Sequence, residues 1–161
     1  MPSPSKPVRC LILACGNTLR SDDGVGPWLA AWAEERFSAE PAVRAIARHQ
    51  WTPDLADDVA HAESVVFVDC TVDAAPGAVR IARVPARSED ALATHHMGAA
   101  ELLALGQELY GSQPRNALLL TVGAGSTEIG ETFSKSVSEA LPEACRLLEN
   151  TIRPLLASSS I

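Results

Sequence analysis

The chain has 161 residues, of which 47% are hydrophobic, and a formal net charge of −7 at pH 7. This length can bury the core of one domain, so we predict a single domain over residues 1–161 with flexible ends at 1–7 and 157–161. The negative charge argues against nucleic acid or an anionic membrane as a partner, and no apolar run approaches the roughly 18 residues that a membrane span needs.

The cysteines and the first residues indicate a cytoplasmic protein. The four cysteines form no C-x-x-C pair, and three of them lie in strongly apolar surroundings, which is typical of reduced core thiols. Residues 1–7 are polar and lack the apolar segment of a secretion signal.

Hydrophobic periodicity predicts strands that alternate with helices along the chain. Strands are expected at residues 8–15, 43–48, 64–70, 78–84 and 116–123, and helices at 26–37, 53–62, 97–110 and 134–156. This alternation is typical of an α/β fold in which a twisted, mostly parallel sheet lies between helices as a three-layer sandwich. Only seven residues, 71–77, separate the third strand from the fourth, too few for a helical crossover. We therefore predict that these two strands form an antiparallel pair in a mixed five-stranded sheet, with the antiparallel member at or near an edge.

The loop after the first strand, residues 16–26, has the sequence GNTLRSDDGVG and contains two adjacent carboxylates. In an open α/β sheet such a loop lies at the carboxyl end of a strand, where these folds bind ligands. Asp22 and Asp23 have two compatible interpretations: one can accept the free amides of the next helix, while the other faces the cleft and binds a cation. The loop contains no G-x-x-x-x-G-K-[ST] motif, so phosphate binding is disfavoured.

A second carboxylate and two histidines are expected at the same edge of the sheet. Asp69 ends the third strand, although an aspartate here can also start a turn. His95 and His96 precede the third helix, and adjacent side chains cannot both face one way in regular structure. A solvated or capping ring is the alternative role for either of them. If Asp23, Asp69 and one of these histidines converge, they form an open site of nitrogen and oxygen donors suited to a divalent transition metal.

Other polar residues give weaker indications. We expect His49 to be peripheral and His61 to be structural, because it ends a helix. Ser21 has no positioned base in the sequence, and the carboxylate beside Cys70 raises rather than lowers a thiol pKa, so neither is favoured as a nucleophile.

The loop at residues 16–26 closely resembles the signature of the hydrogenase maturation endopeptidases, which trim the large subunit of nickel–iron hydrogenases. The resemblance extends over about residues 8–156. Further matching segments follow in the same order: HQWTPDL at 49–55, VDC at 68–70, PG at 76–77 and HHMG at 95–98.

This resemblance implies that Asp23, Asp69 and His95 are the catalytic residues and the metal ligands. It also implies cleavage of a C-terminal peptide from a large-subunit precursor that already holds nickel. The nickel would arrive with this partner, so the free protein would be metal-free or hold another divalent ion. Two positions depart from the family pattern: Ala14 stands where glycine is frequent, and His96 adds a second histidine. Gly98 has the family's spacing from His95.

Two other functions remain as alternatives: a non-proteolytic nickel-binding assembly factor and a metal-dependent hydrolase of small molecules. A nickel carrier usually has histidine-rich or cysteine-rich tracts, whereas this chain has four scattered histidines. A small-molecule hydrolase would retain zinc or manganese on purification. Whether Asp22 acts as a base or only caps a helix is open at this point.

Overall fold

The structure of the protein is a computed structural model that describes residues 7–85 and 97–157. The strands are β1 (Cys10–Cys15), β2 (Val43–Arg48), β3 (Ser64–Thr71), β4 (Val79–Arg83) and β5 (Asn116–Gly123). The helices are η1 (Ser21–Gly24), α1 (Val25–Arg36), η2 (Pro53–Leu55), α2 (Ala56–Ala60), α3 (Ala99–Tyr110) and α4 (Lys135–Ala157). These elements agree with the predicted strands and helices, and the 3₁₀ helix η1 is an addition within the loop of paired carboxylates. Ala157, predicted in a flexible end, is the last residue of α4; residues 1–6 and 158–161 lie outside the described residues.

The five strands form one mixed sheet in the order β2-β1-β3-β5-β4. β1 is parallel to β2 and β3, β3 is parallel to β5, and the edge strand β4 is antiparallel to β5. The prediction of one antiparallel strand at an edge is therefore confirmed.

The predicted pairing of strands 64–70 and 78–84 is wrong, because β5 lies between them. The connection from β3 to β4 crosses the carboxyl end of β5 and is fastened there by backbone hydrogen bonds. Gly77 N donates to Gly123 O (2.9 Å), and Gly123 N donates to Ala78 O (2.8 Å). A short connection can thus join strands that are not neighbours, provided that it passes over the end of the strand between them.

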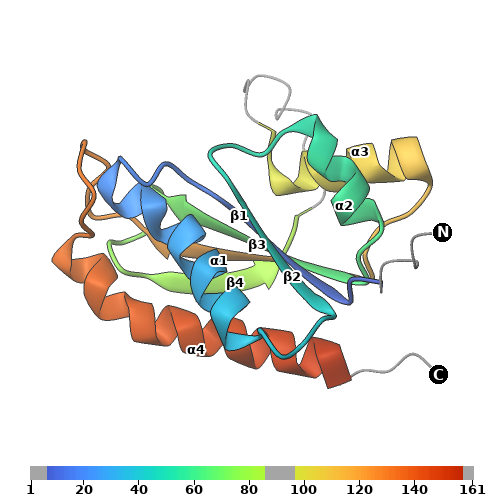
Figure 1. The fold of residues 1–161 in the computed structure, drawn as a ribbon. Helices are drawn as coiled ribbons and strands as arrows, with labels where there is room; N and C mark the ends of the chain where they lie inside the picture. The colour runs from blue at the N-terminus through green and yellow to red at the C-terminus, as the bar shows by residue number, and fades with distance from the viewer. Residues whose placement is uncertain (1–6, 86–96, 158–161) are drawn as a thin grey trace.

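Helices cover both faces of the sheet, with α1 and α4 on one face and α2 and α3 on the other (Figure 1). Side chains of β1 alternate between the two layers: Ile12 packs in the core under α1 and α4, whereas Leu11 and Leu13 pack under α2 and α3. Burial of both faces explains why the first and third strands are continuous apolar runs. In the described part of the chain, no helix is long and apolar enough to cross a membrane.

The parallel strands bring three chain segments to one edge of the sheet. Cys15 at the end of β1 pairs with Arg48 at the end of β2, and Ala14 pairs with Val68 of β3. The loop of paired carboxylates and His49 therefore leave the sheet at the edge where Asp69 lies near the end of β3, which is where open α/β sheets bind their ligands.

Candidate functional site

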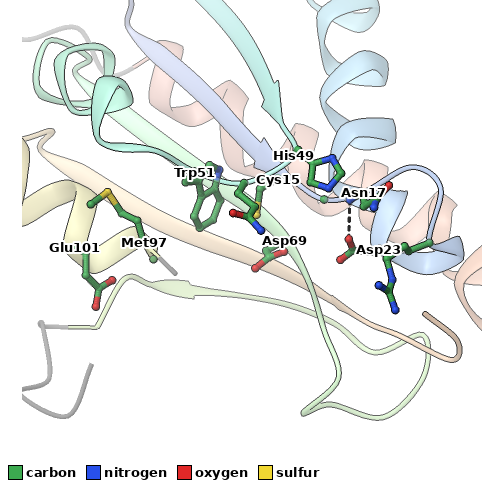
Figure 2. Close-up of a pocket in the computed structure, with 12 residues that line it drawn as sticks. Cys15, Asn17, Asp23, His49, Trp51, Asp69, Met97 and Glu101 are labelled. Carbon is green, nitrogen blue, oxygen red and sulfur yellow. Dashed lines mark hydrogen bonds between the residues drawn. The ribbon is translucent and has the colours of Figure 1, made fainter. Parts of the chain in front are cut away.

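A pocket of about 600 Å³ lies at this edge and contains both predicted carboxylates. Figure 2 shows Asp23 and His49 toward one end, Met97 and Glu101 toward the other, and Asp69 and Trp51 between them. The full lining is Cys15, Gly16, Asn17, Arg20, Asp23, His49, Gln50, Trp51, Asp69, Met97, Gly98 and Glu101. The structure thus brings Asp23 and Asp69 together, although 46 residues separate them in the sequence.

Asp23 is fixed by its own loop and does not cap a helix. Its Oδ2 accepts a hydrogen bond from Asn17 N (2.6 Å), and neither η1 nor α1 has a side-chain cap. The loop closes tightly over Gly16, where a Cβ atom would lie 1.9 Å from Asp23 O, so only glycine fits. Elsewhere in the described chain, no further donor reaches the Asp23 carboxylate, which leaves it one oxygen for a ligand.

Asp22, by contrast, is completely buried and faces the segment between β5 and α4. Its carboxylate accepts hydrogen bonds from Gly125 N (2.7 Å), Ser126 N (2.9 Å), Ser134 N (2.7 Å) and Ser134 Oγ (2.7 Å). Burial acts to raise the pKa of Asp22, but the hydrogen bonds outweigh it and hold this pKa below its usual value. Asp22 is therefore neither a base nor the cap of the helix that follows it: it joins two loops.

Asp69 is a half-buried carboxyl whose pKa is raised to about 6. Burial is the main cause and the charge of Asp23 adds to it, while hydrogen bonds from the Cys15 thiol and from Cys70 N (2.8 Å) oppose it. The following turn is closed by the Thr71 hydroxyl, which accepts from Asp73 N (3.1 Å). The turn-starting role considered for Asp69 is thus filled by Thr71.

His95 and His96 lie outside the described residues, so the structure does not place the predicted third ligand. The chain resumes at Met97 and Gly98, which both line the pocket. Within residues 7–85 and 97–157, no three His, Cys, Asp or Glu side chains are arranged to hold a metal ion. The roles of Asp23, Asp69 and His95 as ligands and catalytic groups remain predictions.

The pocket also contains three residues that the sequence analysis did not place in it. His49 follows β2 at the same edge as Asp69, so the argument that selected Asp69 could have selected it too. Glu101, in the first turn of α3, lies at the end of the pocket away from Asp23, and the buried Trp51 lies in the middle. No periodicity in the sequence indicates that either residue faces a cavity.

The cysteines are poor nucleophiles here. All four are free. The pKa of Cys70 is raised to about 12, mainly by burial and further by the charges of Asp23 and Asp69. Burial also raises the pKa of Cys15, and the neighbouring Asp69 adds to this effect. The prediction that Cys70 is not activated agrees with these surroundings.

Comparison with known proteins gives matches to solved structures. No protein-family model and no curated protein matches the sequence significantly. The [NiFe] hydrogenase maturation protease HycI from Thermococcus kodakarensis KOD1 is 26% identical, with a TM-score of 0.67 over 96% of each chain. HybD from the same organism, also a [NiFe] hydrogenase maturation protease, is 25% identical, with a TM-score of 0.63 over 89% of this chain and 98% of that one.

The hydrogenase maturating endopeptidase HybD from E. coli is 22% identical, with a TM-score of 0.71 over 91% of this chain and 93% of that one. These similarities span almost the whole chain and agree with the resemblance carried by the loop at residues 16–26. The protein has the fold of the hydrogenase maturation endopeptidases.

Proposed function

We propose that this protein is an endopeptidase that removes the C-terminal extension of a nickel-loaded [NiFe] hydrogenase large-subunit precursor. The observation that carries the proposal is the location of the loop at residues 16–26, called the signature loop below. Asp23 of this loop and Asp69 line one pocket, in a chain that shares its fold with a [NiFe] hydrogenase maturation protease over 96% of both chains. All four cysteines are free, as is typical in a reducing compartment, so we also propose a cytoplasmic location.

In this proposal Asp23, Asp69 and His95 hold the nickel that the precursor brings. Two carboxylates and an imidazole form a donor set that suits a divalent transition metal. The Asn17 amide orients Asp23, and the Cys15 thiol and the Cys70 amide orient Asp69. When bound, the metal would polarise the scissile carbonyl group or activate water.

The direct test is processing of a purified precursor. The large-subunit precursor of a [NiFe] hydrogenase from the same organism is incubated with the protein, and mass spectrometry measures loss of the C-terminal extension. We expect cleavage of the nickel-loaded precursor and none of the nickel-free precursor. An intact loaded precursor contradicts the proposal.

The identity of the third ligand is tested separately, by exchanging His95 and His96 for alanine one at a time. We expect only His95→Ala to abolish processing, because Gly98 follows His95 at the family's spacing. Loss confined to His96→Ala shows that the neighbouring histidine is the ligand.

Metal analysis of the protein as purified tests the alternative functions. A nickel carrier should bind nickel tightly without any precursor, and a small-molecule hydrolase should retain zinc or manganese. We expect no stoichiometric nickel in the absence of the precursor.

A further inference from the structure

His49 and Asp69 stand on opposite sides of the end of β1. β1 lies between β2 and β3 in the sheet, His49 directly follows β2, and Asp69 is near the end of β3. Neighbouring strands are about 4.8 Å apart, so the two backbones are separated by about 10 Å across the pocket. This distance leaves room for a peptide group between the imidazole and the carboxylate, and both side chains line the pocket (Figure 2).

The backbone around His49 is held in place on both sides. Gly16 N donates to Arg48 O (3.0 Å), which fastens the preceding residue to the loop that carries Asp23. Two residues further on, Trp51 is only 7% exposed, and its ring meets Phe67 edge-to-face at 5.1 Å between centroids. His49, which is exposed, thus lines the pocket from a backbone segment that is anchored at both ends.

The ring itself has no structural task that the described chain reveals. Across residues 7–85 and 97–157, no side chain or backbone group forms a hydrogen bond or an ion pair with it. The other described histidine differs: His61 Nδ1 contacts Asp57 O and Asp57 Oδ1, both at 2.8 Å. Since Asp23, Asp69 and His49 are not arranged to hold a metal ion, a proton-transfer role fits His49 better than metal ligation.

Peptide hydrolysis needs a proton donor for the leaving amine. The oxygen of water bonds to the carbonyl carbon, the C–N bond breaks, and the amine nitrogen gains a proton. Carboxylates only accept hydrogen bonds until they take a proton from the attacking water, and the guanidinium of Arg20, which also lines the pocket, does not give up its protons. Histidine is the side chain that most often transfers protons in enzymes.

We propose that His49 is a catalytic residue that donates this proton. The inference rests on the proposed endopeptidase function. The ring proton of His49 passes to the amine nitrogen as the C–N bond breaks, and a pocket carboxylate takes the proton of the attacking water. Solvent then returns a proton to His49 and removes one from the carboxylate, so the cycle is balanced.

The first test compares His49→Gln with His61→Gln in precursor processing. For His49→Gln we expect kcat to fall about 100-fold or more, with KM within about threefold of wild type. His61→Gln, which changes the partnered histidine outside the pocket, should retain wild-type kcat. If the wild type does not process the precursor, both the proposed function and this inference are wrong. If the wild type processes it and His49→Gln is equally fast, or changes only KM, the inference alone is wrong.

A second test separates proton donation from other effects. The mass of the wild-type product defines the scissile bond, and semisynthesis replaces that amide by an ester, whose alkoxide leaving group depends less on a proton donor. The ratio of wild-type kcat to the kcat of His49→Gln should be at least tenfold smaller on the ester than on the amide. An equal ratio on both substrates overturns the proposal. Titration with Ni²⁺ alone should give the same affinity for the variant and the wild type. A tenfold loss would identify His49 as a ligand and would also overturn the proposal.

Discussion

Asp23 and Asp69 share one pocket but are held by different donors. A single short hydrogen bond from the Asn17 amide orients Asp23, whereas Asp69 accepts hydrogen bonds from the Cys15 thiol and the Cys70 amide. Burial together with the charge of Asp23 raises the pKa of Asp69. A divalent cation between the two carboxylates would oppose this rise in the pKa of Asp69, because a cation favours the ionised form of a carboxyl group.

Replacement of Asp23 by asparagine should separate the charge of this residue from its shape. The amide oxygen of Asn can still accept the hydrogen bond from Asn17, so the unfolding free energy should change by no more than about 1 kcal/mol. Precursor processing should fall by more than about 100-fold. Loss of a residue that only hydrogen-bonds to a metal ligand already lowers metal affinity or activity by about 10- to 100-fold, and Asp23 is proposed as a ligand itself. Thermal melting and a processing assay measure the two effects. Normal processing by a stable variant would contradict the ligand role.

The raised pKa of Asp69 predicts a pH effect on the stability of the metal-free protein. Between about pH 4 and 6 the folded state retains a proton that the unfolded state has lost, so the contribution of Asp69 to stability increases as pH falls through this range. The change from 3.8 to about 6 corresponds to at most about 3 kcal/mol. Above pH 6, the free energy of unfolding of Asp69→Asn, measured with urea, should therefore be larger than that of the wild type. The difference between the two proteins should vanish near pH 4. A difference independent of pH would contradict this assignment.

At the scale of elements, the signature loop is fastened to the segment between β5 and α4. Besides the bonds to Asp22, Ser21 N donates to Gly130 O (2.8 Å), Ser21 Oγ donates to Glu128 O (2.7 Å), and Gly130 N donates to Leu19 O (2.9 Å). Two loops more than 100 residues apart in sequence thus form one unit beside the pocket. The position of Asp23 consequently depends on hydrogen bonds made by its neighbours.

Asp22→Asn should break this unit while barely changing its volume. The new amide group would place N–H donors against the backbone N–H groups that donate hydrogen bonds to Asp22 in the wild type. We expect the free energy of unfolding to fall by about 2–4 kcal/mol. Because the pKa of Asp22 is lowered by folding, its stabilising contribution is present above the unfolded pKa of about 3.9 and is lost as pH falls below it.

Denaturant unfolding at pH 7 and at pH 3 measures both effects of this exchange. Lys135→Gln, which changes an exposed residue at the start of α4, serves as the control and should leave the stability nearly unchanged. An equally small effect of Asp22→Asn would contradict the structural role of this carboxylate.

At the scale of the whole molecule, the strands of the sheet differ in how well their backbone amides are protected from exchange with solvent. β1 and β3 lie inside the sheet and are buried on both faces, whereas β2 and β4 are its edges. We expect amides of residues 11–14 and 65–68 to exchange with solvent only through global unfolding, and several amides of β2 and β4 to exchange through local opening. Hydrogen exchange followed by NMR spectroscopy measures this; equal protection of β1 and β2 would contradict the strand order.

The sequence by itself determined the elements, the α/β class and two pocket residues. Burial on both faces of the sheet leaves continuous apolar runs at β1 and β3, and the amphipathic helices between the strands carry their own period, so local patterns are sufficient. Asp23 and Asp69 could be named because such patterns reveal the two strands: Asp23 lies in the loop after the first, and Asp69 lies near the end of the other.

Only the tertiary structure decided which strand lies beside β4, which groups hold Asp22, and that His49 belongs to the pocket. The insertion of β5 beside β3 is a long-range pairing that no local pattern encodes. Asp22 and Asp23 are chemically identical, and their roles separate only because η1 turns one toward the amides of a loop 103 residues away and the other toward the pocket. His49 lies in the pocket because β2 is next to β1 in the sheet, and the packing of the whole chain sets which strands are neighbours.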